Sequence, residues 1–235
     1  LRGDFGVSYT KAGLTVNKVI ADGFPFSLTI GIYASLVVVF AGILFGSVCA
    51  LRQNKLIDRF FMVLSTLGST IPSFVLATGF LFLFSKTLGL VPAFGVDEVA
   101  GYIGPVLVIG AFPLSFITRL TRTSLVEVQQ QDYIRTARSK GISEFKVIYK
   151  HALRNALLPV VTYIGPMVAS IVTGSFVIET VFGIPGVGQL FTDSIVNRDY
   201  PLIMGITVFF AVLLVLAVLI VDLVYVLIDP RIKLD

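Results

Sequence analysis

The sequence predicts an all-α membrane protein, a polytopic bundle of five transmembrane helices with one long cytoplasmic loop. Of its 235 residues, 56% are hydrophobic and only 14% are charged, and the mean hydropathy is +0.94. Soluble domains carry about a quarter charged residues, so this composition excludes an ordinary soluble fold. A span needs roughly 20 apolar residues, and the chain contains five such runs. They lie at 28–50, 61–84, 102–118, 160–178 and 202–228.

The distribution of basic residues predicts the topology. Thirteen of the 18 Lys and Arg residues follow the first, third or last span, and the others lie among acidic residues on the opposite side. Because basic residues favour the cytoplasmic side, the C-terminus and the loop after the third span are predicted to be cytoplasmic. The net charge of +4 does not indicate nucleic-acid binding, since no soluble domain is predicted to carry a basic face. The predicted regions are an external segment at 1–25, a transmembrane domain at 26–228 with a cytoplasmic loop at about 119–156 and an external loop at about 179–201, and a cytoplasmic tail at 229–235.

The first span is predicted to follow an irregular segment. Four glycines and Pro25 interrupt residues 1–27, so we expect the span to open only at Ser27. An external start without a preceding span predicts that a further N-terminal span exists and is missing from this sequence. The first span carries three small residues at intervals of four, a spacing that lets membrane helices approach closely. They are Gly42, Gly46 and Ala50.

The second span is interrupted near its middle by the sequence STLGSTIPS. Pro72 lacks a backbone donor, so a carbonyl of the preceding turn needs another partner. Two interpretations remain open: a kink in which Ser and Thr bond to their own helix, or the lining of a water-filled path. The fourth span offers a further hydroxyl on a face of small residues. The candidate path residues are Ser69, Thr70, Ser73 and Thr173.

The cytoplasmic loop is predicted to contain two short amphipathic helices. Ile134 and Ala137 share a face of the first, Gly141 permits a sharp joint, and Ser143 is placed to cap the second. A basic loop on anionic lipid headgroups is one interpretation. A defined joint favours the other, a helical tip inserted into a groove of another protein. The apolar stripe of the second helix comprises Phe145, Ile148, Tyr149, Ala152 and Ala156.

This loop resembles the cytoplasmic signature of membrane subunits of bacterial ATP-binding-cassette importers. That signature reads Glu-Ala-Ala, three residues, Gly, nine residues, Ile, one residue, Leu-Pro. Only Ala137, Gly141 and Leu153 match it strictly. The chain is much more similar to one branch, the first of the two permease subunits of dipeptide, oligopeptide and nickel importers. The matching stretches are DYIRTARSKG, KHALRNALLPV, GSFVIETVFGIPGVGQL, NRDYP and VDLVYVLIDPRI.

The resemblance implies the fold of a type I importer permease and half of an import pathway for short peptides in a bacterial or archaeal inner membrane. Expected partners are a second homologous permease, two ATPase subunits that hold ATP and Mg, an extracytoplasmic binding protein and the lipid bilayer. Nickel or another small solute is the alternative cargo. The loop would couple to one ATPase through Tyr133, Ile134, Arg135, Ala137, Arg138, Gly141, Phe145 and Ile148.

Catalytic and metal-binding patterns are missing from the sequence. It has no P-loop motif, its only histidine, His151, has no second metal ligand near it, and its only cysteine, Cys49, is expected to pack in the first span. No catalytic residue or bound cofactor is therefore predicted. Asp222 is expected either to pair with a basic loop residue or to act in transport, and Glu179 either to contact an external partner or to be solvated.

An ion-driven secondary transporter and an intramembrane enzyme are the rival classes. The first needs ionisable groups at mid-membrane or inverted repeats, and the second needs paired catalytic groups within the spans. The sequence shows neither pattern, so both are disfavoured.

Overall fold

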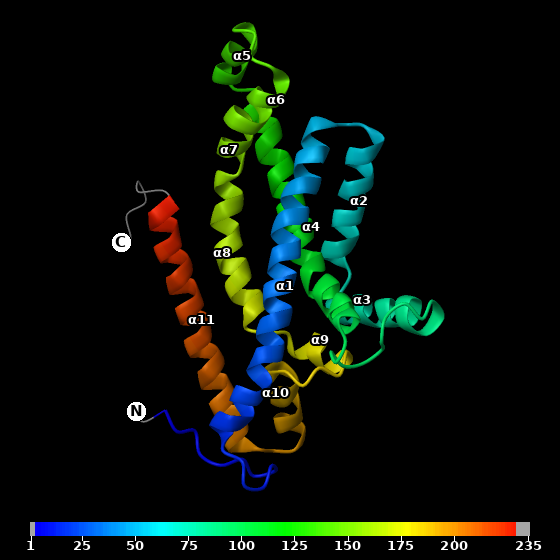
Figure 1. The fold of residues 1–235 in the computed structure, drawn as a ribbon, viewed down its shortest axis with the longest axis vertical. Coiled ribbons are helices and arrows are strands. Elements are labelled where there is room, and N and C mark those ends of the chain that lie inside the picture. The colour runs from blue at the N-terminus through cyan, green and yellow to red at the C-terminus, as the bar shows by residue number, and fades with distance from the viewer. Residues whose placement is uncertain (1–2, 229–235) are drawn as a thin grey trace. The chain divides into compact units, whose positions relative to one another are not determined.

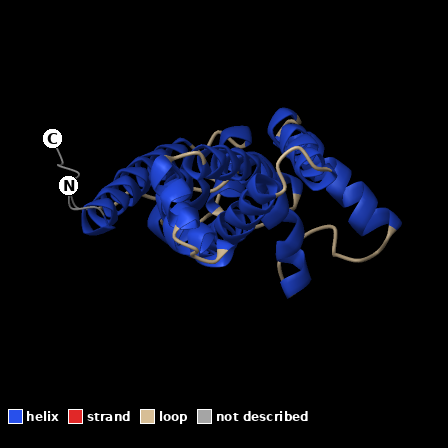
Figure 2. Cartoon of the chain, turned by 90° about the horizontal axis from the view of Figure 1, so that it is seen from above, coloured by secondary structure: helices blue, strands red, loops and turns tan. Residues whose placement is uncertain are grey.

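The structure, a computed structural model, describes residues 3–228, without the side chains of Asp222 and of residues 224–228. Within that range the chain forms helices joined by turns and loops, and no strand (Figure 2). The all-α prediction is therefore confirmed. The predicted tail at 229–235 and both roles weighed for Asp222 lie outside the described residues and side chains.

Long helices alternate with groups of short ones along the chain (Figure 1). In order they are α1 (Val16–Leu51), α2 (Leu56–Thr70), α3 (Ser73–Phe80) with a π-helical continuation (Leu81–Thr87), a 3-10 turn (Val99–Tyr102), α4 (Ile103–Gln129), α5 (Asp132–Ser139), α6 (Glu144–Lys146), a π-helical turn (Val147–Ala152), α7 (Leu153–Ala156), α8 (Leu158–Val172), α9 (Phe176–Val181), α10 (Val187–Val196) and α11 (Tyr200–Ile228).

The lengths of these helices agree with up to five membrane spans. Among the described residues, three helical stretches are long and apolar enough to span alone, and two interrupted helix pairs could each form one more span. The single stretches are Val16–Leu51, Val99–Gln129 and Tyr200–Val221, and the pairs are Leu56–Thr70 with Ser73–Thr87 and Glu144–Ala156 with Leu158–Val172.

The chain divides into two compact units, each described by itself. Unit 2 consists of Leu36–Ile71 and Gly110–Gly165 and holds the predicted cytoplasmic loop. Unit 1 holds the remaining segments, Leu1–Ser35, Pro72–Ile109 and Pro166–Asp235.

Helix α1 in unit 1 begins much earlier than predicted. Val16, Val19 and Ile20 recur at helical spacing and are buried against residues of α10 and α11 such as Val187 and Leu202. Each fully buried Val or Ile stabilises by about 1.5–3 kcal/mol, so together they outweigh the roughly 3 kcal/mol that a proline costs inside a helix. The prediction of irregular structure up to residue 27 is therefore wrong from Val16 onward, and Pro25 lies within α1.

The second predicted span is two helices rather than one kinked helix. Helix α2 ends at Thr70, and Ile71 and Pro72 are extended, with ψ of 127° and 140°. Proline has no N–H to continue the helix and disfavours the helical conformation of the residue before it, which accounts for both extended residues. Helix α3 starts afresh at Ser73.

Helix packing in unit 2 depends on the small residues noted in the sequence. A Cβ atom added at Gly42 would lie 2.6 Å from Ile117 Cγ2, and one at Gly46 would lie 2.5 Å from Thr121 Cβ. Helices α1 and α4 therefore touch where α1 has no side chain, as the small-residue spacing predicts.

Candidate coupling loop and buried carboxylates

The loop after α4 has its own apolar core. Ile134 is fully buried and Ala137 almost so, and both pack with Leu125 of α4 and with Val147 and Ala152 of the following turn. We predicted that Ile134 and Ala137 would contact an ATPase. That prediction is wrong, because neither side chain is available at the surface. They hold α5 against the end of α4 instead.

Gly141 forms the sharp joint that the sequence predicts. Its φ is +73°, and it is the left-handed residue that follows Lys140, the C-cap of α5. The Gly141 N–H donates to the carbonyl of Arg138 at 2.9 Å, and the Ile142 N–H donates to the carbonyl of Ala137 at 3.3 Å. These two bonds are those of a Schellman motif, in which glycine takes the strained position at little cost. Ser143 occupies the predicted N-cap position of α6, although its side chain makes no capping hydrogen bond.

A π-helical turn changes which residues of the second amphipathic stretch are buried. From Val147 to Ala152 the turn is wider than an α-helix, so residues five apart lie on one face. Val147 and Ala152 are fully buried, and Ala156 continues the buried face four residues later. The predicted stripe from Phe145 through Ile148 assumed an α-helix throughout, and its first half is wrong. Ile148 is only half-buried.

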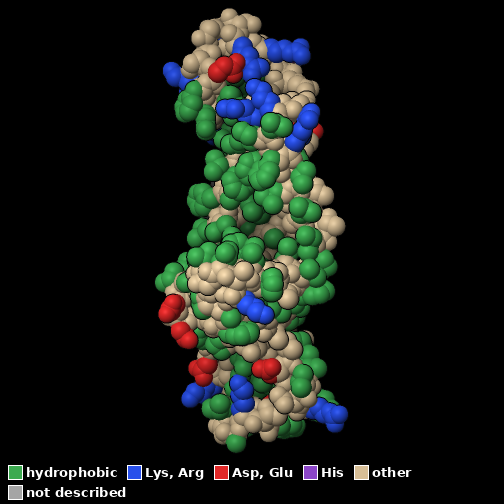
Figure 3. Space-filling model, turned by 90° about the vertical axis from the view of Figure 1, so that its right-hand side faces the viewer, with side chains coloured by type: hydrophobic (Ala, Val, Ile, Leu, Met, Phe, Trp, Pro, Cys, Tyr) green, Lys and Arg blue, Asp and Glu red, His purple; other side chains and the backbone are tan. Residues whose placement is uncertain are grey.

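The residues left outside are aromatic and basic. Phe145 is 69% exposed, and its ring lies 4.4 Å, between centroids, from that of the exposed Tyr149. Tyr133 is also exposed and accepts a 2.8 Å hydrogen bond from Asn155 Nδ2. Arg135 is exposed as well. Figure 3 shows Lys and Arg side chains gathered at the end of unit 2 that carries this loop.

The joint also bears an ion pair and an open pocket. Arg138 Nε donates to Glu144 Oε1 at 2.8 Å, so the two sides of the joint are connected. The pocket is open and basic. It is lined by Gly141, Ile142, Ser143, Lys146, Lys150 and His151.

The four candidate path residues belong to different units. Ser69 and Thr70 lie in unit 2, and Ser73 and Thr173 in unit 1. The Ser69 hydroxyl donates to the carbonyl of Thr66 at 3.1 Å, and that of Thr173 to the carbonyl of Ser170 at 2.7 Å. Such bonds are the ones expected if Ser and Thr side chains bond only to their own helix, which was the structural interpretation of this region. Thr70 and Ser73 are exposed, so the path interpretation stays a prediction.

Glu179 is buried, contrary to both expectations for it. Only 1% of the residue is exposed, so it is neither solvated nor open to an external partner. Glu179 Oε2 accepts from the N–H groups of Gly188 at 2.8 Å and Gln189 at 3.2 Å, at the start of α10. The Ser27 hydroxyl accepts from the Val187 N–H at 2.9 Å. Glu179 and Ser27 therefore cap α10, where helix N–H groups favour an anion.

The glycines of the external turn give Glu179 its space. A Cβ at Gly188 would lie 2.9 Å from Glu179 Oε2, and one at Gly186 still closer. Burial raises the pKa of the Glu179 carboxyl, and hydrogen bonds, including those from Ser27 and the α10 backbone, partly oppose this.

Sequence reasoning missed a second buried carboxylate, Asp199. It lies at the start of α11, is fully buried, and accepts from the hydroxyls of Ser8 and Thr10 and from the N–H groups of Tyr9 and Thr10. Its Oδ1 also accepts from the Leu202 N–H at 3.3 Å. Asp199 thus fixes the N-terminal segment to α11. Its position next to a helix start was the one available signal.

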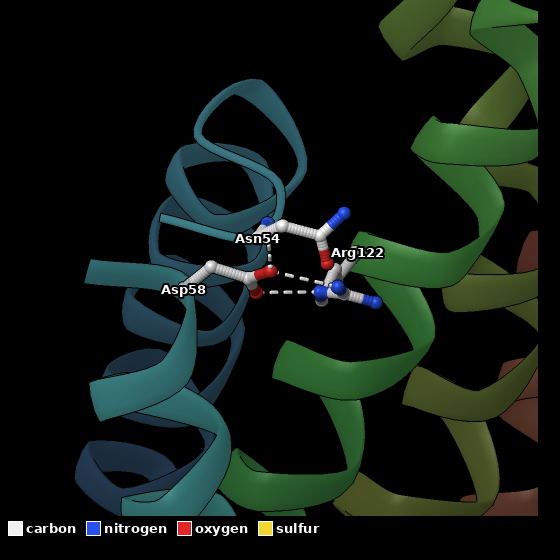
Figure 4. A network of polar contacts seen from close by, with 3 residues as sticks. All are labelled: Asn54, Asp58 and Arg122. Carbon is white, nitrogen blue, oxygen red and sulfur yellow. Dashed lines mark hydrogen bonds and ion pairs between the residues drawn. The ribbon is translucent and has the colours of Figure 1, made fainter. Parts of the chain in front are cut away.

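A third buried carboxylate, also missed, joins two helices of unit 2. Arg122 of α4 donates through Nε and Nη2 to Asp58 of α2 at 2.6 and 2.7 Å (Figure 4). The N–H of Asn54, a residue with φ +63°, donates to Asp58 Oδ2 at 2.8 Å. The Asp58 side chain is 3% exposed and that of Arg122 22%. The pair is therefore bidentate and largely withdrawn from solvent.

The comparisons with known proteins identify the family. The family model described as binding-protein-dependent transport system inner membrane component matches residues 42–234. The chain belongs to this family. The dipeptide transport system permease protein DppB of Bacillus subtilis is 49% identical, over 98% of this chain and 75% of that protein. The oligopeptide transport system permease protein OppB of Haemophilus influenzae is 43% identical, over 99% and 76%.

Solved structures show the same fold at low identity. A chain of the MetNI methionine ABC transporter, in inward-facing conformations, matches with a TM-score of 0.71 at 16% identity, over 88% of this chain and 94% of that chain. A chain of an amino acid ABC transporter matches with a TM-score of 0.69 at 15% identity, over 92% and 95%. These similarities confirm the predicted importer permease fold.

Proposed function

We propose that this protein is a permease subunit of an ATP-driven importer and forms half of the pathway for short peptides. The observation that carries the proposal is the 49% identity to a dipeptide permease along nearly the whole chain. A second permease would complete the pathway, two ATPase subunits with ATP and Mg would drive it, and an external binding protein would deliver the peptide. The proposal places the loop and the C-terminus in the cytoplasm, as the basic residues predict.

The exposed surface of the loop supports a protein partner. An aromatic pair flanked by basic side chains is typical of the anchors that fill pockets at protein interfaces. We therefore assign the ATPase contact to exposed aromatic and basic residues of the loop, Tyr133, Arg135, Phe145 and Tyr149. Ile134, Ala137 and Gly141 act indirectly, because they hold this surface in shape.

The pathway lining stays part of the proposal. Exposed hydroxyls at Thr70 and Ser73 are easiest to hydrate in a water-filled path. Ser69 lies beside Thr70 on α2, and Thr173 directly follows α8.

Reconstitution into liposomes tests the function. The complete complex, with both permeases, the ATPase subunits and the binding protein, should take up labelled dipeptides only when ATP is supplied. Uptake by this chain alone, or uptake driven by an ion gradient without ATP, would contradict the proposal. Uptake of nickel but not of peptides would keep the architecture and replace the cargo.

The aromatic contact has its own test. Replacing Phe145 and Tyr149 together with alanine should reduce co-purification of the ATPase, since both rings lie outside the loop core. Ser139→Ala, at another exposed loop position, is the matched control. Unchanged ATPase binding in the double variant would leave the lipid-headgroup interpretation in its place.

A further inference from the structure

The Asp58–Arg122 pair lies where the loop meets the rest of unit 2. Arg122 is three residues before Leu125, a fully buried member of the loop core. The same core includes Ala50, near the end of α1 and four residues before Asn54, whose N–H bonds to Asp58. The ion pair and the loop core are therefore close together both along α4 and across the turn that joins α1 to α2.

Helix α2 is held to α4 at two levels. The ion pair holds its first turn, at Asp58. Further along, a Cβ at Gly68 would lie 2.5 Å from Ser115 Oγ and 3.1 Å from the carbonyl oxygen of Ala111, so the two helices touch there as well. Contacts at both ends leave α2 little freedom to tilt against α4.

The two contacts differ in strength and kind. The contact at Gly68 is close packing without a hydrogen bond between the two helices, whereas the ion pair has two short, charge-assisted hydrogen bonds of fixed geometry. A pair withdrawn from solvent adds little net stability compared with well-packed apolar residues, but it does fix geometry in some proteins. Its position thus favours a positioning role over a purely stabilising one.

We infer that the Asp58–Arg122 pair is a positioning device that makes α2 follow displacements of the loop. A displacement at the loop core would pass to α4 at Leu125 and, through the pair, to the first turn of α2. The far end of α2 carries Ser69 and Thr70 of the proposed pathway. The inference rests on the proposed ATP-driven transport and adds the element that carries movement from the loop to the pathway.

A set of three variants separates positioning from stability. Arg122→Leu leaves the buried Asp58 carboxylate without its cation, so the assembled complex should lose thermal stability. Asp58→Asn with Arg122→Leu removes both charges and keeps an oxygen for the Asn54 N–H, so stability should return close to that of the wild type. Arg119→Leu removes a charge from the same helix, at a side chain that makes no ion pair with any described residue, and is the matched control.

Uptake per ATP hydrolysed is the decisive measurement. In the double variant we expect this ratio to stay reduced by about fivefold or more, a typical size for coupling between sites, although stability has recovered. Arg119→Leu should leave the ratio unchanged. If the ratio returns to normal together with stability, the pair is only structural and the inference is overturned.

A distance measurement separates failure of this inference from failure of the proposed function. Spin labels at the exposed positions Leu56, on α2, and Ser139, in the loop, can be placed in a Cys49→Ala background. We expect a narrow distance distribution with the pair intact and a clearly broader one in the double variant. If the two distributions are equally narrow, the pair does not position α2. If the wild-type complex shows no ATP-driven uptake, the proposed function fails, and the distances still test the pair.

Discussion

Replacing Asp199 with asparagine tests whether one buried carboxylate holds the N-terminal segment in place. Burial alone would raise the pKa of Asp199, but hydrogen bonds from Ser8, Thr10 and the N–H groups of Tyr9 and Thr10 outweigh it and lower the pKa from 3.8 to about 2. Asparagine keeps one acceptor oxygen and turns the other position into a donor, which cannot receive these bonds.

The size of the effect follows from the shift in pKa. A change from 3.8 to about 2 corresponds to roughly 2.4 kcal/mol, or about a 60-fold change in the equilibrium for opening the segment. Because the folded pKa is below the unfolded one, this stability is present above about pH 4 and is lost as the pH falls through about 2. From pH 6 to pH 3, the protection of the segment's amides against hydrogen exchange should fall about sevenfold in the wild type.

Hydrogen exchange at the amides of Tyr9 and Thr10 measures this opening directly, after correction for intrinsic rates. At pH 6 both amides should exchange about 60-fold faster in Asp199→Asn than in the wild type, and the difference should shrink at pH 3. Asp193→Asn, an exposed carboxylate on α10, is the control and should change nothing. Exchange within threefold of wild type at pH 6 would refute the proposed role of Asp199.

Three further perturbations test other features. Glu179→Gln should speed exchange of the Gly188 amide by about tenfold or more, because the carboxylate caps α10; unchanged exchange would mean that the cap is dispensable. Gly141→Val should weaken ATPase co-purification, since a β-branched residue is strained at φ +73°, whereas Gly141→Asn should be tolerated. Equal loss in both variants would mean that the added side chain, and not backbone strain, disturbs the contact. Single cysteines at Ser69 and Ser73, without Cys49, should react with a water-soluble thiol reagent in at least one nucleotide state, and complete protection of both in all states would favour the structural interpretation.

Local patterns in the sequence predicted the features that depend on local physics. Apolar runs indicated the spans because the bilayer requires length and hydrophobicity, and Gly141 indicated a joint because glycine accepts positive φ. The start of α1 at Val16 was missed because its stability comes from burial against α10 and α11, which outweighs the local effect of Pro25.

Side-chain contacts between residues far apart in the sequence could not be predicted from local patterns. Asp58 and Arg122 are 64 residues apart, and neither has a neighbour in sequence that marks the pair. Glu179 looked like the solvated end of a span because its partners, Ser27 and the start of α10, meet only in the folded chain. The basic residues located the loop and the family resemblance suggested its role, but burial decided which of its residues face outward.

Because of the wide turn from Val147 to Ala152, the direction in which the loop's aromatic surface faces depends on the number of residues in that turn. A π-helical turn is equivalent to an α-helix with one extra residue inserted. Removing one residue there would restore ordinary α-helical winding and rotate Phe145 by about 100° relative to Ala156, because an α-helix turns by that angle for each residue. The aromatic surface would then face a different direction with its composition unaltered. An alignment that closes such a gap would therefore pair residues that lie on different faces of the helix.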